Sequence, residues 1–451
     1  MSLIADAKAF VDKLLHRRDD RCCPHCGSTL TKKNGTRQRT LRDLGGIRSV
    51  SIQRHWCFDC RRSYSEELPD IAPHHWYTRR AQRKFLDMYT TIGGSLRRCA
   101  SWITAEVTGA GRTFLWDPLA RVRWRGHTPE PEPEIELSHT TGWRWVQAAG
   151  GSWRTREKAY ADVPQSGAVA SDATYVRIRG VWTAILGIVD GIKRMTFGLF
   201  PLATAESDQE IERAFDLAAQ AGLNLEQIKV FASDGASGFR EFLARCLHWV
   251  RHQRCVFHLW RNVLPIITRY AAAAGDEWAA GLKTCIACVW NATTRAEAET
   301  MLKLLVGVYG TQPIAQEAVC LVQDTFEQAM THLVAGLSGL GRTSCVCEWV
   351  WRYYKDRVRQ MGGFMSTDGC DHFNAVWEVA LNFRRYQRRK ERLRHYMYPG
   401  LCPLEVAGVM VQDVTWLDAL AVLSRGPRTA PQHPVATTLH LAPGSWLSSK
   451  A

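Results

Sequence analysis

The sequence predicts a multidomain α/β protein, in which a core built on a mixed β-sheet follows a metal-binding β-ribbon and a small helical domain. Three observations lead to this fold class. Two Cys-x-x-Cys pairs lie near the N-terminus, a proline-and-acid segment begins at Thr128, and strand-like runs that carry acids follow this segment. A chain of 451 residues is too long for one ordinary core, so several domains are expected.

The composition favours a polyanionic partner. The chain has 58 Lys and Arg against 44 Asp and Glu, which gives a formal net charge of +14, and such an excess is typical of proteins that bind nucleic acid. The first residues carry charges where a signal peptide needs an apolar run, and no stretch is long and apolar enough to cross a bilayer. We therefore expect a cytoplasmic protein with no membrane partner.

The two cysteine pairs predict a structural zinc site. Cys23 and Cys26 form the first pair, and Cys57 and Cys60 form the second. Two such pairs complete the tetrahedral thiolate shell of a closed zinc site. The residues between them alternate like β-strands around a Gly-Gly pair and include many Lys and Arg, which can bind phosphates. This segment is therefore expected to be a zinc ribbon.

The segment 79–124 predicts short helices that are separated by glycines. They fit a helix-turn-helix whose later helix enters the major groove of DNA, although many small helical bundles share this pattern. From Thr128 to Leu137, proline alternates with acidic residues, which favours an extended connector. We expect a domain boundary there.

Two aspartates on predicted strands are candidate catalytic residues. Strands are predicted at 168–179, 180–190, 194–202 and 228–232. Asp172 lies inside the first of these strands, and Asp234 closely follows the fourth. The first and fourth strands can be neighbours in such a sheet, so the two carboxylates can meet and hold Mg²⁺, which prefers carboxylate oxygens. Two such ions can catalyse substitution at a phosphodiester.

The run from Ser233 to Asn262 resembles the Mutator-type and related bacterial insertion-sequence transposases. The matching features are Ser-Asp-Gly-Ala at its start, Gln253 before Cys255-x-x-His258, and Arg-Asn at its end. The resemblance covers 165–395 and implies an RNase H-like fold with an acidic triad that begins with Asp172 and Asp234. It also implies an all-helical insertion before the third acid. Cys255 and His258 match the family's Cys-x-x-His positions, where a role beside the site fits better than a second zinc.

The third acid has two main candidates. Glu378 has the residue type that is usual in the family and precedes a basic cluster at the family's spacing, whereas Asp371 fits the small polar lead-in before it. We favour Glu378 and keep Asp371 as the alternative; Glu348 or an incomplete triad are the remaining interpretations. The basic cluster predicts contact with DNA phosphates and contains Arg384, Arg385, Arg388, Arg389 and Lys390.

The expected domains are an N-terminal helix and zinc ribbon (1–70), a helix-turn-helix-like DNA-binding domain (71–127), a linker (128–150), the first part of the catalytic core (151–258), an all-helical insertion (259–363), the third-acid helix of the core (364–400) and a C-terminal tail (401–451). The resemblance implies a DNA transposase that cleaves and transfers strands at the ends of a mobile element, with two Mg²⁺ ions or Mn²⁺ in their place. Its expected partners are double-stranded DNA and further copies of the chain, in a homodimer or larger assembly at the bacterial nucleoid. The alternative is a domesticated, catalytically inactive transposase that regulates genes by binding specific DNA sequences.

Overall fold

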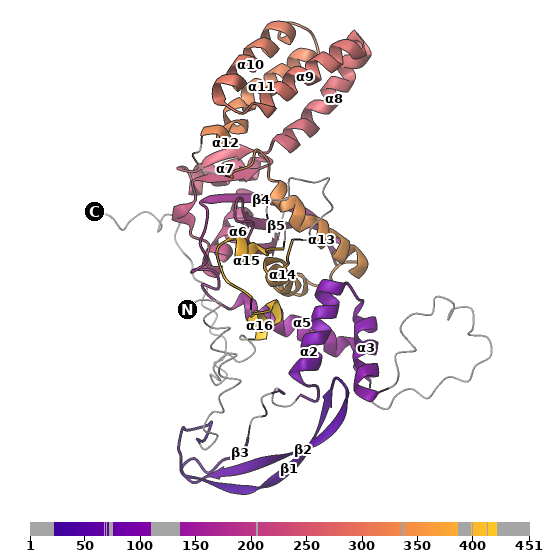
Figure 1. The fold of residues 1–451 in the computed structure, drawn as a ribbon, viewed down its shortest axis with the longest axis vertical. Helices are drawn as coiled ribbons and strands as arrows, with labels where there is room; N and C mark the ends of the chain where they lie inside the picture. The colour runs from indigo at the N-terminus through magenta and orange to yellow at the C-terminus, as the bar shows by residue number, and fades with distance from the viewer. Residues whose placement is uncertain are drawn as a thin grey trace, which may run out of the picture.

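The computed structural model describes residues 22–66, 68, 70–71, 75–109, 136–203, 206–334, 336, 339–386, 398, 400–412 and 414–421. These residues form an elongated molecule, with a curved β-ribbon at one end, a sheet covered by helices in the middle and a helical bundle at the other end (Figure 1). The mixed α/β class predicted from the sequence is confirmed. No helix in the described part is long and apolar enough to span a membrane.

The β-ribbon consists of antiparallel strands in the order β1-β2-β3, with bounds β1 (Thr31–Asp43), β2 (Gly46–Cys57) and β3 (Ser63–Ser65). Gly45 and Gly46 form the turn between β1 and β2, and their φ angles of 95° and 147° suit glycine. Apart from Cys57, the residues buried in β1 and β2 are Leu41, Ile52 and His55. The ribbon therefore has little apolar core of its own.

A small helical domain connects the ribbon to the sheet. Its elements are α2 (Arg79–Asp87), a π-helical turn η1 (Met88–Ile92), α3 (Leu96–Thr108) and α5 (His139–Arg154). α5 packs against both α2 and α3, and it occupies much of the segment 128–150 where we expected a linker. Ser138 caps the helix, and burial of Trp145, Val146 and Trp153 stabilises it. The last helical run expected in this domain, at 113–124, lies outside the described residues.

The central sheet has the strand order β6-β5-β4-β7-β8. Its strands are β4 (Ala168–Ile178), β5 (Val181–Asp190), β6 (Thr196–Pro201), β7 (Val230–Ser233) and β8 (Arg251–Arg254). β5 is antiparallel to both β4 and β6, whereas β7 is parallel to β4 and to β8. This mixed arrangement places β4 in the middle of the sheet.

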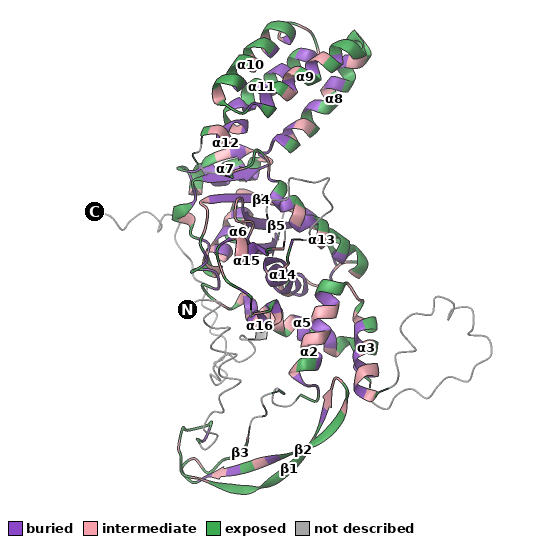
Figure 2. Cartoon of the chain, in the orientation of Figure 1, coloured by how far each residue is buried: buried purple, intermediate pink, exposed green. Residues whose placement is uncertain are grey.

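Helices cover both faces of the sheet. They are α6 (Asp208–Ala221), α7 (Ser237–Cys246), α13 (Cys345–Met361) and α14 (Thr367–Asn382), with a short 3₁₀ turn η3 (Leu225–Gln227) before β7. Phe231 of β7 packs against aromatic rings of α6 and α7, whereas Trp351 of α13 lies against Gly187 of β5. Because side chains alternate along strands, these contacts place α6 and α7 on one face and α13 on the other. α14 is buried over most of its length (Figure 2).

The helical bundle at the far end of the molecule has an apolar core separate from that of the sheet. Its helices are α8 (Val256–Ala274), α9 (Asp276–Asn291), α10 (Arg295–Tyr309), α11 (Ala315–Ala329) and the short α12 (Thr331–Val334). The bundle therefore starts slightly before the expected insertion (259–363). It also ends earlier, because the buried residues of α13 belong to the core of the sheet.

The C-terminal segment is partly docked on the core. α15 (Pro403–Val406) and α16 (Trp416–Ala421) both pack against α14, and α16 also contacts α5. The expected tail over 401–451 therefore includes helices that contribute to the core, whereas 422–451 lie outside the described residues.

The contact between α5 and α14 depends on a glycine. A Cβ at Gly150 would lie 1.9 Å from the carbonyl oxygen of His372 in α14. We expect Gly150→Ala to lower the free energy of unfolding by about 1–3 kcal/mol, because the helices must move apart. Gly307 of α10 is the matched control, since nothing lies within 4 Å of its Cβ position, and Gly307→Ala should stabilise by about 0.5–1 kcal/mol. Urea unfolding measures both effects, and a Gly150→Ala variant as stable as wild type would contradict the close approach.

Candidate active site

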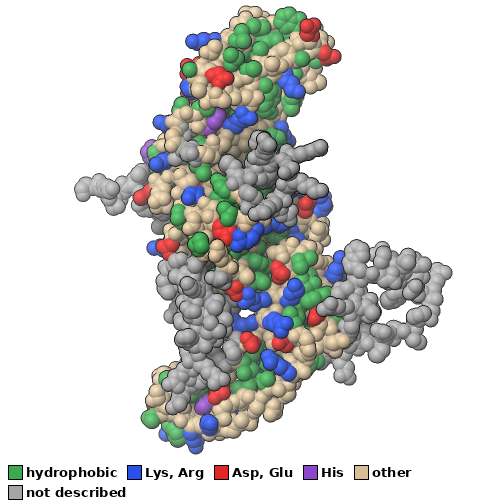
Figure 3. Space-filling view, viewed as in Figure 1, with side chains coloured by type: hydrophobic (Ala, Val, Ile, Leu, Met, Phe, Trp, Pro, Cys, Tyr) green, Lys and Arg blue, Asp and Glu red, His purple; other side chains and the backbone are tan. Residues whose placement is uncertain are grey.

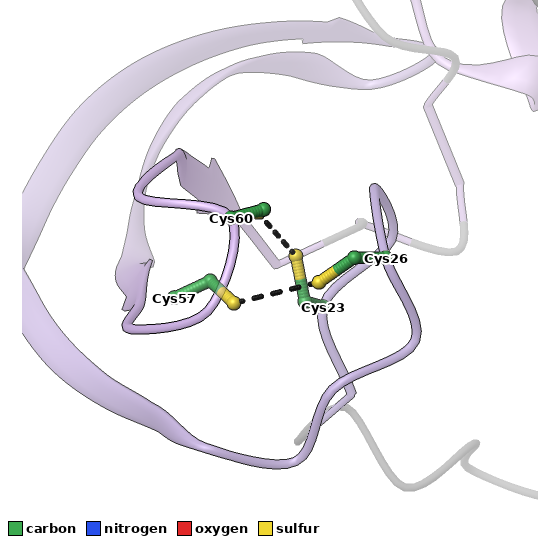
Figure 4. Close-up of side chains that lie close together, drawn as sticks. All are labelled: Cys23, Cys26, Cys57 and Cys60. Carbon is green, nitrogen blue, oxygen red and sulfur yellow. Dashed lines mark hydrogen bonds between the residues drawn. The ribbon is translucent and has the colours of Figure 1, made fainter.

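The four cysteines predicted as zinc ligands come together at the end of the ribbon (Figure 4). The Sγ atoms of Cys23 and Cys60 are 3.6 Å apart, as are those of Cys26 and Cys57, and all four sulfurs lie within 4.8 Å of one another. A tetrahedral zinc with bonds of about 2.3 Å separates its sulfur ligands by about 3.8 Å. The cluster could therefore bind a structural metal ion such as zinc.

Backbone donors around the cluster favour a thiolate. The backbone N–H of Cys60 donates to the sulfur of Cys57, and this hydrogen bond is the largest influence that lowers the pKa of Cys57, to about 7. Thiolates, not thiols, bind metal ions. This part of the ribbon is therefore prepared for a cation.

Asp172 and Asp234 lie next to each other at the middle of the sheet. Asp172 is on β4, Asp234 directly follows β7, and these strands pair with Ala170 opposite Ala232, so the two aspartates continue the same register. Burial raises the pKa of Asp172 to about 6; the charge of Asp234 adds to this rise, and His258 opposes it. A divalent cation would compensate the close, partly buried negative charges.

Cys255 and His258 lie beside this acid pair, at the corner where β8 leads into α8. The sulfur of Cys255 accepts a hydrogen bond of 3.3 Å from the backbone N–H of Ser344, the residue before α13. A hydrogen bond to Cys255 raises the pKa of His258, and the charges of Asp172 and Asp234 raise it further. The motif thus holds α8 and α13 together and places an imidazole near both acids.

Glu378 and Asp371, both on α14, lie in a different cluster centred on Arg154. One oxygen of Glu378 accepts hydrogen bonds from Trp153 Nε1 and the Tyr160 hydroxyl, both at 3.1 Å. Its other oxygen accepts one from Arg154 Nη1 at 2.9 Å. Arg154 Nε also donates to Asp371 at 3.1 Å. Burial raises the pKa of Glu378, and these donors partly oppose that rise.

The Arg154 cluster lies at the edge of the sheet. Arg154 Nη2 donates to the carbonyl of Leu199 in β6 at 3.0 Å. Leu199 is opposite Gly187 of β5, and Gly187 is opposite Asp172 of β4. Two strand spacings, about 10 Å, therefore separate Asp172 from the strand beside Glu378, whereas paired catalytic ions lie only about 4 Å apart. The structure thus brings neither Glu378 nor Asp371 to the acid pair.

Glu348 of α13 is better placed to be the third acid. α13 crosses the sheet over Asp172: a Cβ at Gly187, the cross-strand partner of Asp172, would lie 2.7 Å from Trp351. Lys355, further along α13, contributes to lowering the pKa of Asp172 against the larger effect of burial.

Glu348 shares a flank of α13 with Lys355, because seven residues make about two helical turns. It is exposed, and its carboxylate has no hydrogen bond or ion pair with another described residue. The helical spacing of the buried residues around Glu348 was the available sequence signal; these residues are Cys347, Val350, Trp351, Tyr354 and Val358.

The predicted basic cluster is partly engaged with the protein itself. The Arg384 guanidinium lies 3.7 Å from the ring centre of Tyr353, and Arg385 donates to Glu405 at 2.6 Å. Arg388, Arg389 and Lys390 lie outside the described residues. Elsewhere, Lys and Arg side chains gather in the middle of one face, near α2 and α5 (Figure 3).

Comparisons with known families agree with this arrangement. Residues 146–333 match the model of the Mutator family of transposases, a range that contains Asp172, Asp234 and the Cys255-x-x-His258 motif. Residues 23–94 match a domain of unknown function, DUF6431, which covers the four clustered cysteines. None of the curated proteins matches the chain.

Proposed function

Because residues 146–333 are a Mutator-family transposase region, we propose that the chain cleaves DNA at the ends of a mobile element and joins those ends to new DNA. The observation that carries this proposal is the meeting of Asp172 and Asp234 on adjacent parallel strands. The sheet order, with the first strand between the second and the fourth, supports an RNase H-like core.

We assign Asp172, Asp234 and Glu348 as the acidic triad, in place of a triad completed by Glu378 or Asp371. These three carboxylates would hold two Mg²⁺ ions, or Mn²⁺ in their place. When bound, such ions activate a water or a 3′-hydroxyl and stabilise the leaving oxygen of a phosphodiester. The protein positions the acids from three different elements, namely β4, the end of β7 and α13.

His258 and Lys355 have supporting roles in this proposal. Both place positive charge near Asp172, and this charge reduces the repulsion between the carboxylates when DNA phosphates approach. The Cys255 contact with Ser344 fixes the start of α13, and therefore the position of Glu348 one turn later. Cys255 is thus a positioning residue.

The ribbon and the helical domain would recognise the ends of the element. A structural zinc on Cys23, Cys26, Cys57 and Cys60 would hold the ribbon, which presents basic side chains to DNA phosphates. Strand transfer requires two ends in one complex, so we propose a homodimer or larger assembly on double-stranded DNA.

An excision assay tests the proposed function. The assay uses the wild-type chain, Mg²⁺ or Mn²⁺, and a mini-element flanked by the DNA that borders the gene. Wild type should excise the element, and Asp172→Ala and Asp234→Ala should not. Excision that survives either substitution would refute the mechanism. A wild-type chain that binds the ends specifically but never cuts them would favour the domesticated regulator.

Removal of zinc should unfold the ribbon selectively, since few residues of the ribbon strands are buried. We expect Cys57→Ser to purify without zinc and to bind DNA about tenfold more weakly, because the basic strands lose their fixed shape. The thermal unfolding of the sheet core should not change. Cys22→Ser is the matched control, because this neighbouring thiol is exposed and outside the cluster. Equal zinc content in wild type and Cys57→Ser would contradict the site.

A further inference from the structure

Two arginines lie next to Asp234, on the side away from Asp172. Arg254 ends β8, where it is opposite Ser233 of β7, and Arg240 lies early in α7, which starts just after Asp234. Electrostatic interactions link Arg254 to both Arg240 and Asp234. One short turn thus separates a candidate metal ligand from two guanidinium groups.

Arg254 packs directly against the turn that follows Asp234. Gly235 in this turn has a φ of 80°, and a Cβ there would lie 2.7 Å from Arg254 Nε. The glycine therefore leaves room for the guanidinium to lie against the backbone. Arg254 Nε is buried and has no hydrogen-bond partner among the described residues.

The protein provides no direct partner for this positive charge. Within the described ranges, neither Arg240 nor Arg254 makes a hydrogen bond or an ion pair with an acid, and the first turn of α7 carries no acidic residue. Burial lowers the pKa of Arg254, and the like charge of Arg240 lowers it further. Two close guanidinium groups without a counter-charge are unfavourable unless an anion joins them.

We propose that Arg240 and Arg254 form a binding site for a DNA phosphate that neighbours the scissile phosphate. The inference rests on the proposed function, because Asp172 and Asp234 mark the position of the scissile phosphate. β4, β7 and β8 are consecutive neighbours, so Asp172, Asp234 and Arg254 lie in a row, with strand spacings of about 4.8 Å. A DNA strand that crosses the acids would next meet the arginines, whose planar groups suit phosphate oxygens.

The salt dependence of DNA binding tests this site without requiring cleavage. The full-length chain is titrated into a short fluorescein-labelled duplex of arbitrary sequence, with Ca²⁺ in place of Mg²⁺, and the affinity is measured by anisotropy over a series of salt concentrations. Each arginine that no longer binds a phosphate should lower the slope of log affinity against log salt by about one. We expect this fall for Arg240→Ala and Arg254→Ala, and largely restored binding for Arg254→Lys.

Arg245→Ala is the matched control on the same helix, because Arg245 is already ion-paired with Asp208 and Glu212. It removes the same charge and should leave the slope unchanged. The phosphate site would be refuted if Arg245→Ala lowers the slope as much as Arg240→Ala, or if neither Arg240→Ala nor Arg254→Ala lowers it. Arg240 is exposed, so misfolding should not confuse its result.

The two proposals can fail separately. If Asp172→Ala abolishes excision while both arginine variants bind DNA with the wild-type slope, the transposase mechanism stands and the phosphate site is wrong. If the slope falls as expected but the wild-type chain never cleaves DNA, the phosphate site stands and the catalytic proposal is wrong.

Discussion

Glu348→Gln should abolish excision of the element, whereas Glu378→Gln should leave most of it intact. The first substitution removes a carboxylate that we place at the metal ions, and the second changes a side chain that pairs with Arg154 at the edge of the sheet. Metal-ion stabilisation of the transition state is worth several kcal/mol. The excision rate of Glu348→Gln should therefore fall by about a thousandfold or more.

The two variants form a matched pair, because each changes one glutamate to its neutral isostere. Glu348 is exposed, so Glu348→Gln should melt like wild type. In Glu378→Gln the amide oxygen can still accept from the groups around it, so we expect at most a moderate loss of stability. The assignment would be overturned if Glu378→Gln melted normally but lost excision while Glu348→Gln remained active.

The acid pair could be predicted because its signals are local. Each of the strands β4, β5 and β6 is marked by an apolar run with glycines or polar residues at its ends, and Asp172 lies inside the first run. The turn at Gly180, with a φ of 81°, fixes the hairpin between β4 and β5. Neighbouring parallel strands then bring Asp234 to Asp172.

The third acid could not be identified in the same way, because its environment depends on distant contacts. Glu378 precedes a basic cluster at the spacing of the family, but its partner Arg154 is 224 residues away in the sequence. No local pattern reveals that pairing. The assignment of α13 to the helical insertion also concealed Glu348, since the helix packs on the sheet instead.

The linker expectation failed for a related reason. Proline and acidic residues predict an extended chain only where they occur, up to Leu137. The next residues contain glycines that weaken a helix in isolation. In the folded protein, Gly142 and Gly150 allow α5 to approach Phe85 and α14 closely, and tertiary packing outweighs the low intrinsic propensity.

Arg154→Ala should lower the free energy of unfolding of the core by about 3–5 kcal/mol, because it leaves a buried carboxylate without its charged partner. Glu378 has no exposed surface, and Arg154 joins it to Asp371 and to the carbonyl of Leu199. Urea unfolding followed by tryptophan fluorescence measures the loss. Arg144→Ala on the same helix is the control; its side chain is exposed, and its effect should stay within about 0.5 kcal/mol.

The pH dependence of this loss identifies its cause. Burial already raises the pKa of Glu378 in the wild type, and Arg154 opposes that rise, so removal of Arg154 should raise this pKa further. A carboxyl whose pKa is higher in the folded state than in the unfolded state loses stability as the pH rises from its unfolded value of 4.5 to its folded value. The deficit of Arg154→Ala should therefore be smallest in acid and grow towards neutral pH. Adding Glu378→Gln to Arg154→Ala should remove most of this pH dependence, because no buried carboxylate then remains at that position. A deficit equal at all pH values would show that the missing packing of Arg154, rather than the unpaired charge of Glu378, destabilises the core.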